Sequence, residues 1–454
     1  MYLFVRFNFL ALLFSGISSS LAAAEPEPPN VVILFCDDAG YGDFGFAGHP
    51  TIATPHLDRM VGEGTRLTQF YSASPACTAS RYGLLTGRHP NRSGFSWVLG
   101  PNSKIGVHPR EVTLAETLKA QGYATACYGK WHLGIGRKGL AGINEDHSFL
   151  PLQNGFDEYF GIPYSNDMRP CVLIENNKVA SRKVDQSTLT REYTERTIAF
   201  IEKNRQQPFF VYLPYAMPHV PLFPGKAHRG RSLRGLYGDV IEEIDWSVGA
   251  ILAALREKKL AEKTLVVFTS DNGPWLIKKL RGGSSGLFRD GKGSTWEGGM
   301  REPGVFWWPG TIPAGKTRQE IASTWDLLPT ITLLAGGKVP NDRTLDGKDI
   351  RDVLLGRNKP PITKPIFFGG PGASTIQAVR VGPWKLHIKT NSQLRLHHGW
   401  PNVSRKNPLL FHLEHDPSET INLAKRESET VAKLLKVIDQ YNAGREKEGT
   451  FWDK

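Results

Sequence analysis

Short apolar runs alternate with helical patterns along most of the chain, and this alternation constrains the fold more than any other feature. Residues 31–36 (VVILFC) are apolar at every position, which is typical of a strand buried on both faces of a parallel sheet. Similar runs at 124–128, 209–213 and 265–269 are also predicted to be strands. Apolar residues recur at helical spacing over 240–255, between the last two runs. The pattern predicts an α/β fold with a largely parallel sheet flanked by helices.

Two of the intervening helices carry recognisable start signals. Thr54 is placed as an N-cap, with Pro55 at the first helical position. Thr113 and Glu116 fit a capping box, and their helix is expected to end at Gly122. These signals fix where the helices begin between the predicted strands.

The C-terminal part of the chain has a different pattern. Short strand-like pieces at 378–381 and 384–388 precede an amphipathic helix whose apolar face includes residues 431–438. These elements predict a small α+β unit with an antiparallel sheet. The 454 residues also exceed the roughly 250–300 that one hydrophobic core usually serves. We therefore expect a leader over residues 1–24, a catalytic unit over 25–358 and an α+β subdomain over 359–454.

The N-terminus has the pattern of a secretory signal peptide. Arg6 precedes the apolar run 7–17, and small residues ending in 22–24 (AAA) follow. The run is short for crossing about 30 Å of hydrocarbon, so we expect cleavage after Ala24 and no membrane anchor. No later apolar stretch has spanning length. The predicted location is secreted or periplasmic.

The charge balance indicates an anionic partner. Lys and Arg total 56 against 44 Asp and Glu, a formal net charge of +12. Nucleic acid, anionic lipid, an acidic small molecule and a polysaccharide would each suit this charge. Export argues against nucleic acid and favours extracellular polyanions such as sulfated polysaccharides.

Polar residues follow the predicted strands where each one ends. These residues are Asp37 and Asp38, Lys130 and His132, His219, and Asp271 and Asn272. In open α/β sheets, ligands bind beyond the carboxyl ends of the strands, so we expect these side chains to converge. Carboxylate and amide oxygens suit a hard cation such as Ca²⁺ or Mg²⁺. The spacing of the Cys and His residues does not indicate structural zinc.

Cys77 begins a segment of small and apolar residues that is predicted to be a helix ending near Gly87. A thiol at a helix N-terminus beside Arg81 is expected to have a depressed pKa. By itself this pattern fits a structural cysteine, a thiol nucleophile or a residue modified after synthesis. Cys36 and Cys127 lie in predicted strands and are expected to be buried core thiols. Because the chain has only 4 cysteines, at most one disulfide remains once Cys77 is set aside.

The segment Cys77-Thr78-Ala79-Ser80-Arg81, followed by 85–87 (LTG), resembles the type I sulfatase signature Cys-x-Pro/Ala-x-Arg. In that family the cysteine is oxidised to formylglycine. Ala79 stands where proline is commoner in the family. The maturation signal accepts alanine at this position. The match covers about residues 30–445, and the segment 161–165 is similar to the arylsulfatase A and N-acetylgalactosamine-6-sulfatase group. The other matching segments are Asp37-Asp38, 129–134, Pro218-His219, 271–273, Lys292, 297–299 and 410–419.

The resemblance implies an alkaline-phosphatase-like fold and a role for each matching residue. Formylglycine at Cys77 would hydrate, attack sulfur through one hydroxyl and release the alcohol. The second hydroxyl would then lose its proton and expel sulfate, which restores the aldehyde. Ca²⁺, or less readily Mg²⁺, would be held by Asp37, Asp38, Asp271, Asn272 and the modified Cys77. The implied catalytic and substrate-binding residues are Arg81 and Lys130 for the hydrated nucleophile, His132 for elimination, His219 for protonating the alcohol, and Lys292 and Ser165 for sulfate.

The same resemblance implies the partners. A formylglycine-generating enzyme or an anaerobic sulfatase-maturating enzyme would modify Cys77, and the substrate would be a sulfated small molecule or glycan. Two alternatives remain open: a phosphodiester or phosphonate monoester hydrolase of the same superfamily, and a non-catalytic polyanion-binding protein. The basic residues Lys278, Lys279 and Arg281 and the run 228–234 are expected either to line the substrate cleft or to form a solvated surface. The sequence does not specify an oligomeric state.

Overall fold

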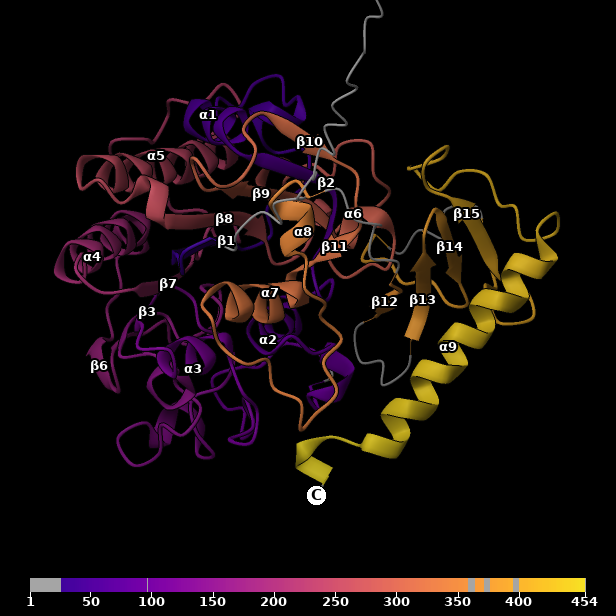
Figure 1. Ribbon diagram of the computed structural model, residues 1–454, viewed down its shortest axis with the longest axis horizontal. Coiled ribbons are helices and arrows are strands. Elements are labelled where there is room, and N and C mark those ends of the chain that lie inside the picture. The colour runs from indigo at the N-terminus through magenta and orange to yellow at the C-terminus, as the bar shows by residue number, and fades with distance from the viewer. Residues whose placement is uncertain (1–25, 96, 358–363, 371–375, 395–399, 454) are drawn as a thin grey trace, which may run out of the picture.

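The computed structural model describes residues 26–95, 97–357, 364–370, 376–394 and 400–453. They form a larger body around an 11-stranded mixed sheet and a smaller body around a 4-stranded sheet (Figure 1). The predicted leader and the predicted boundary at residue 358 lie outside the described residues. Within the described ranges, every helix is too short or too polar to cross a membrane.

The larger sheet has a parallel centre with antiparallel strands toward both edges. Its strands run in the order β10-β2-β9-β8-β1-β7-β3-β4-β5-β6, and β11 pairs with β2. Strands β8, β1, β7, β3 and β4 are parallel, whereas β9 is antiparallel to both of its neighbours. The strands are β1 Asn30–Cys36, β2 Thr65–Tyr71, β3 Ala124–Tyr128, β4 Glu158–Gly161, β5 Leu173–Glu175, β6 Lys178–Ser181, β7 Phe209–Pro214, β8 Thr264–Ser270, β9 Arg301–Trp307, β10 Lys316–Arg318 and β11 Ala322–Ser323.

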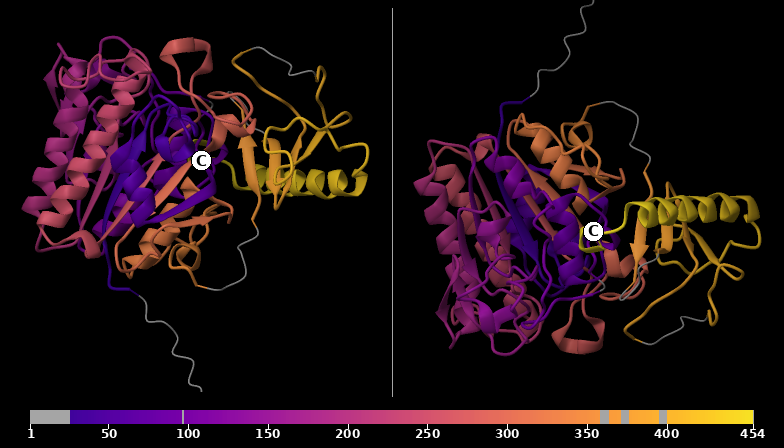
Figure 2. Two further views of the ribbon diagram at one scale, coloured as in Figure 1. Left: turned by 90° about the horizontal axis from the view of Figure 1, so that it is seen from above. Right: turned by 90° about the horizontal axis from the view of Figure 1, so that it is seen from below.

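Helices cover both faces of this sheet, as the all-apolar central strands require (Figures 1 and 2). Along β1, Val31 and Ile33 pack on one face, and Val32 and Leu34 pack on the other. The first face is covered by α2 Cys77–Thr86, α3 Leu114–Lys119, α7 Leu327–Leu334 and α8 Arg351–Leu354. The second face is covered by α1 Pro55–Glu63, α4 Leu189–Lys203 and α5 Leu236–Glu257. This confirms the predicted α/β architecture.

The predicted helix signals are only partly correct. The capping box between Thr113 and Glu116 is present, but α3 ends at Lys119, and Gly122 lies beyond it with a φ of 82°. Thr54 occupies the N-cap position of α1 and Pro55 is its first residue, as predicted, but the Thr54 side chain makes no capping hydrogen bond. Its hydroxyl instead accepts a hydrogen bond from the Gly45 amide at 2.8 Å and donates one to Asp58 at 3.0 Å.

The smaller body is the predicted α+β unit. Strands β12 Ile366–Gly369, β13 Ile376–Val381, β14 Trp384–His387 and β15 Leu409–His412 form an antiparallel sheet in sequence order. Helix α9, Ser428–Glu448, packs on this sheet through Leu434, Ile438 and Tyr441. Its apolar stripe is the one that the sequence pattern predicts.

Buried ion pairs join the two bodies near β14. Glu297, at the start of α6 (Glu297–Met300), lies 2.9 Å from the ammonium of Lys385 on β14. Glu419 accepts a hydrogen bond from the Glu297 amide at 2.7 Å and lies 3.1 Å from the same ammonium. All three side chains are fully buried, and Arg301, 3.3 Å from Glu297, supplies a second positive charge against the two carboxylates.

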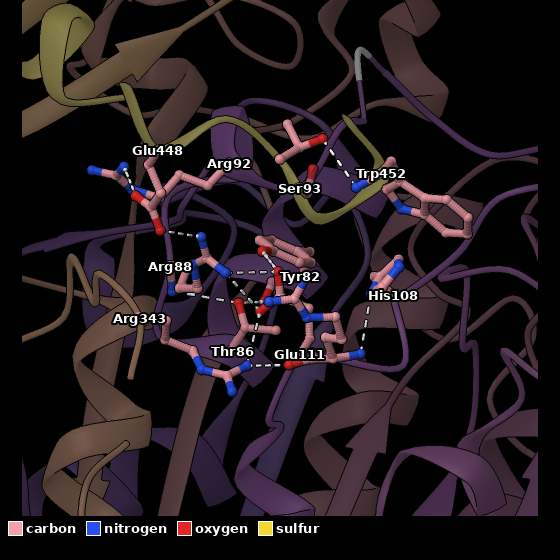
Figure 3. Close-up of polar contacts among 12 residues, drawn as sticks. Tyr82, Thr86, Arg88, Arg92, Ser93, His108, Glu111, Arg343, Glu448 and Trp452 are labelled. Carbon is pink, nitrogen blue, oxygen red and sulfur yellow. Dashed lines mark hydrogen bonds and ion pairs between the residues drawn. The ribbon is translucent and has the colours of Figure 1, made fainter. Parts of the chain in front are cut away.

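The end of the described chain returns to the larger body and forms what we call the C-terminal clasp, residues Glu448, Phe451 and Trp452, of which Figure 3 labels Glu448 and Trp452. The Glu448 carboxylate lies 2.9 Å from Arg88 and 2.7 Å from Arg92, both in the segment after α2. The Phe451 ring faces the Arg88 guanidinium at 4.9 Å, and the Trp452 ring contacts His108 edge-on at 4.8 Å. The clasp is therefore a second connection between the bodies.

Candidate active site

Four neighbouring parallel strands place their polar residues at one edge of the larger sheet, as the sequence predicts. Asp37 and Asp38 follow β1, Lys130 follows β3, His219 follows β7 and Asp271 follows β8. The Lys130 ammonium lies 2.5 Å from Asp37, and Asp271 accepts a hydrogen bond from the Asp38 amide at 3.1 Å. All five side chains are buried. The structure thus brings residues from distant parts of the chain into one charged cluster.

The acidic residues of this cluster are arranged as a cation site. Ligand atoms of Asp37, Asp38, Asp271 and Cys77 all lie within 4.8 Å of one another. Two further features point to an unsatisfied site: Asp37 Oδ1 and the side-chain oxygen of Asn272 are buried and accept no hydrogen bond from any described residue. Hard cations prefer several oxygen ligands that lie this close together. The residues present therefore fit Ca²⁺ or Mg²⁺.

The carboxylates respond to burial in opposite ways. Burial opposes ionisation of Asp37, but the charges of Lys130 and Arg81 hold its pKa well below the usual range. Burial and the neighbouring charge of Asp37 raise the pKa of Asp271 to about 7. A bound divalent cation would favour the ionised form of both groups.

Cys77 is the first residue of α2, so its thiol lies at the N-terminus of a buried helix beside the acidic cluster. Its Sγ atom is 3.5 Å from the Lys292 ammonium and 3.9 Å from Asp38. The expected depression of its pKa is wrong. Burial raises the pKa of the thiol well above its usual value, although Lys130 and Lys292 act in the opposite direction. The environment therefore does not favour a thiolate nucleophile.

Lys292 and His219 face Cys77 from two different loops. The Lys292 ammonium is 2.7 Å from Asp38, whose charge raises the pKa of this lysine even though burial lowers it. His219 Nε2 lies 3.6 Å from Asp38. Its Nδ1 lies 2.6 Å from the Val220 carbonyl and 3.0 Å from the Asn166 side-chain oxygen, so Nδ1 is the protonated nitrogen of the neutral ring. Burial and Lys292 lower the pKa of His219 to about 4.

The remaining predicted residues lie near Cys77 and the acidic cluster. Arg81, one turn further along α2, donates to Asp271 at 2.8 Å and to the Lys130 carbonyl at 2.8 Å. Lys130 also reaches the Ser165 hydroxyl at 3.2 Å. His132 contacts the Leu99 carbonyl through Nε2 at 2.8 Å, while its buried Nδ1 has no hydrogen-bond partner within the described ranges. Burial and the charges of Lys130 and Arg81 lower the pKa of His132 well below its usual value.

Two glycines allow the strand ends to approach closely enough to form the site. A side chain at Gly161 would lie 1.7 Å from the Gly129 carbonyl oxygen. A side chain at Gly129, which has a φ of 146°, would lie 1.9 Å from the Pro214 carbonyl oxygen. Gly129 directly precedes Lys130, so these contacts set the position of the lysine beside Asp37.

Two residues of the site are absent from the sequence-based set. The Asn166 amide donates to the carbonyls of His219 at 3.2 Å and Pro221 at 3.1 Å, so it holds the loop as well as the imidazole. The Trp275 ring lies 5.2 Å from the His219 ring and 4.5 Å from the Lys292 ammonium. Each follows a segment that matches the family, Asn166 after 161–165 and Trp275 after 271–273. Their nearness in the sequence to these segments is the signal that points to them.

The other cysteines take no part in the cluster. Cys36 and Cys127 are fully buried in strands, which confirms the prediction of core thiols. Cys171 is partly buried. All four cysteines of the chain fall within the described ranges and all are free thiols, so none of them forms a disulfide.

The mixed sheet, its flanking helices and the charged cluster at the strand ends define a hydrolase with the alkaline-phosphatase-like fold. Residues 29–337 match the sulfatase family model, and residues 363–448 match the model for the C-terminal region of aryl-sulfatases. The chain belongs to the sulfatase family, whose members are sulfuric ester hydrolases. This confirms the resemblance carried by the Cys77 segment.

Named relatives match over nearly the whole chain. Human arylsulfatase A is 39% identical over 464 residues, which cover 94% of this chain and 89% of the relative. The N-acetylgalactosamine-6-sulfatase of Canis lupus familiaris is 38% identical over 461 residues, which cover 92% of this chain and 85% of the relative. Both names belong to the group that the segment 161–165 predicts.

Solved structures from work on sugars share the fold. A structure from work on glycosaminoglycan metabolism by Bacteroides thetaiotaomicron has a TM-score of 0.83 at 28% identity, covering 92% of this chain and 100% of its own. The structure of Ps i-CgsB in complex with k-i-k-neocarrahexaose has a TM-score of 0.79 at 28% identity, covering 92% of this chain and 93% of its own.

Proposed function

We propose that this enzyme is an exported sulfatase that hydrolyses a sulfate ester on a glycan, with formylglycine at Cys77 as nucleophile and Ca²⁺ as metal. One observation carries the proposal. The Cys77 Sγ atom lies between the Lys292 ammonium at 3.5 Å and Asp38 at 3.9 Å, inside a cluster of oxygen ligands. The raised pKa of this thiol argues against a thiolate nucleophile and is consistent with a modified residue.

Asp37, Asp38, Asp271 and Asn272 would hold the cation. When bound, the metal would supply positive charge beside the nucleophile and the sulfate oxygens. Arg81 and Lys130 already compensate part of the acidic charge through contacts with Asp271 and Asp37. The preference of this site for Ca²⁺ over Mg²⁺ stays a prediction.

His219 would protonate the departing alcohol. Its Nδ1–H points to the Val220 carbonyl and the Asn166 oxygen, which leaves Nε2 as the nitrogen that faces the site. A proton delivered from Nε2 would leave a neutral ring held in the same orientation. Because the pKa of His219 is about 4 in the free protein, we infer that the negative charge of a bound sulfate raises it before proton transfer.

Lys292 would act when the sulfate ester is cleaved, and His132 would act when sulfate is eliminated. The Lys292 ammonium would bind a sulfate oxygen and the bridging oxygen as negative charge develops there. His132 has a neutral ring whose Nδ1 is unpartnered among the described residues, so it can accept the proton that the second hydroxyl of the hydrated aldehyde loses. Loss of that proton would expel sulfate and restore the aldehyde.

The names of the relatives support a carbohydrate substrate. N-acetylgalactosamine-6-sulfatases and a protein solved with neocarrahexaose are both similar to this chain. The segment 1–24 supports export, because it has the composition of a cleavable leader.

The test combines mass spectrometry with kinetics. Protein made in a host with formylglycine-forming machinery should contain a Cys77 peptide with the mass of the aldehyde or its hydrate. A Cys77→Ala variant should lose turnover of an aryl sulfate by about 10³-fold or more. Cys171→Ala removes a partly buried thiol outside the cluster and should retain activity.

Two results would contradict the proposal. One is full activity from protein in which Cys77 is found only as the unmodified thiol. The other is an aryl phosphonate or phosphodiester hydrolysed far faster than the aryl sulfate, which would favour the alternative chemistry of the superfamily.

A further inference from the structure

Exposed apolar side chains gather beside the candidate active site. The described residues include six large apolar side chains that are exposed, and five of them lie in the segments 229–236 and 276–289. We call these two segments the loop patch. Leu233 is 87% exposed and Leu280 is 79% exposed; the others are Leu236, Ile277 and Leu287. Apolar side chains concentrated in this way usually mark an interaction surface.

Hydrogen bonds hold the two segments of the loop patch together. The Arg234 guanidinium donates to the carbonyl oxygens of Leu280 at 3.0 Å and Gly282 at 3.1 Å. The second segment contains the short helix η7, Leu276–Arg281, and the salmon-coloured loop around it protrudes from the larger body (Figure 2). Leu233 and Leu280 therefore lie in two segments that are hydrogen-bonded to each other.

The loop patch is strongly basic as well as apolar. Its first segment contains Arg229, Arg231 and Arg234, and its second contains Lys278, Lys279, Arg281 and Arg289. Neither segment contains an Asp or a Glu. The surface thus combines a net positive charge on each segment with exposed leucine and isoleucine side chains.

The loop patch adjoins the active site through Trp275, the residue that precedes η7. One side of the Trp275 ring lies near the Lys292 ammonium at 4.5 Å, and Lys278 of the patch lies 4.1 Å from the ring centroid. A partner bound to the patch would therefore lie next to the residues that face Cys77.

We propose that the loop patch docks the enzyme on an anionic lipid surface. A sulfated glycan would satisfy the lysines and arginines but offers no apolar partner for Leu233 and Leu280. A second copy of the same patch would oppose positive charge with positive charge. An anionic bilayer supplies negative headgroups for the cations and an acyl boundary for the leucines. This inference does not depend on the formylglycine mechanism.

Vesicle co-sedimentation of the full chain tests the inference. We expect binding to phosphatidylcholine vesicles that contain phosphatidylglycerol, little binding to phosphatidylcholine alone, and release by added salt. The double variant Leu233→Ser/Leu280→Ser should bind the anionic vesicles about tenfold more weakly. The triple variant Lys278→Gln/Lys279→Gln/Arg281→Gln should lose about 100-fold at low salt.

Ile421 provides the matched control, because it is the sixth exposed apolar side chain and lies outside the loop patch, with 60% exposure. Ile421→Ser should bind vesicles like the unchanged protein. An unchanged melting temperature and unchanged hydrolysis of a soluble sulfate ester would show that the Leu233→Ser/Leu280→Ser protein is intact. The inference is overturned if the unchanged chain does not bind anionic vesicles, or if the leucine double variant binds them as well as the unchanged chain does. A patch-dependent change in sedimentation without lipid would overturn it in favour of a protein interface.

Discussion

The positively charged ammonium of Lys292 lies close to both Cys77 and the cation site. A Lys292→Ala change removes the ammonium that lies 2.7 Å from Asp38, so we expect kcat for a sulfate ester to fall by about 10²–10³-fold. Lys178→Ala, at an exposed position on β6, should leave kcat unchanged. Steady-state kinetics on both variants check this, and equal activity of the two would remove Lys292 from the mechanism.

Chelation tests the cation site by a stability measurement. Three buried carboxylates in one cluster should bind Ca²⁺, which would stabilise the folded state by mass action. We expect EDTA to lower the melting temperature by about 2–5 °C and added Ca²⁺ to restore it. Asp271→Asn removes one ligand charge and should abolish the response to Ca²⁺. A melting curve indifferent to EDTA and Ca²⁺ would contradict the assignment.

At the scale of single residues, the sequence predicts which side chains meet but not their electrostatics. The motif around Cys77 identifies Arg81 beside the thiol, and the expected low pKa follows from that pair alone. In the structure Arg81 is occupied by Asp271 and Cys77 is buried, so desolvation sets the direction of the shift. Asn166 escapes prediction for a related reason, because its contact with His219 joins residues 53 apart in the chain.

At the scale of elements, the approach of β3 to β4 depends on glycine. Gly161→Ala would place a methyl group 1.7 Å from the Gly129 carbonyl, so we expect a loss of about 2–4 kcal/mol in the free energy of unfolding, or no folded protein. Gly62→Ala is the control. Gly62 lies in α1, where an added methyl group would meet no described atom within 4 Å, so alanine should stabilise by about 0.5–1 kcal/mol. Denaturant titrations distinguish these opposite signs.

His89 should make the junction between α2 and β12 sensitive to acid. Its Nδ1 accepts from the Asn91 amide at 3.2 Å, and its Nε2 lies 3.2 Å from the Phe367 carbonyl, so the neutral ring is satisfied at both nitrogens. Burial lowers the pKa of His89 to about 4, with Arg92 acting in the same direction. The unfolded chain therefore takes up the proton first, and stability falls as the pH drops from about 6.5 toward 4.

The expected contribution of His89 is about 2 kcal/mol between about pH 7 and pH 5. A His89→Gln variant lacks the titrating group, so its free energy of unfolding should fall less over this interval. Chemical denaturation of both proteins at the two pH values gives the difference. Identical pH slopes would show that His89 is not shifted.

The elements themselves were predictable to different degrees. Strands β1, β3, β7 and β8 are apolar at nearly every position and sit at the centre of a covered sheet, so the sequence identifies them. Strand β9 begins with Arg301, Glu302, Pro303 and Gly304, which have no strand pattern, yet every residue of β9 is buried. Only residues 305–307 of this strand are apolar, and this run is too short to indicate a strand by itself, so tertiary packing against β2 and β8 determines it.

At the scale of the whole molecule, the C-terminal clasp should make the two bodies unfold together. Glu448→Ala leaves Arg88 and Arg92 with one fewer carboxylate, and we expect a loss of about 1–3 kcal/mol. Hydrogen exchange in α9 should become faster than exchange in the central strands. Glu446→Ala changes an exposed position on the same helix and should have no such effect. Parallel behaviour of the two variants would show that the clasp does not couple the bodies.

The two-body organisation was predictable from the change in pattern near residue 360, but the clasp was not. Glu448 and Arg88 are separated by 360 residues, and neither lies in a motif. Their pairing depends on the length and direction of α9, which the amphipathic pattern does not specify.

The burial of Cys77 has a consequence for the order of events during synthesis. Its side chain is 1% exposed at the start of an entirely buried helix, so no enzyme can reach it in the finished fold. The proposed oxidation must therefore happen while the chain is still open, and it competes in time with folding. A molecule that folds first remains permanently unmodified. The specific activity of a preparation would then depend on the rate of oxidation relative to the rate of folding. Slower folding during synthesis would yield a larger active fraction.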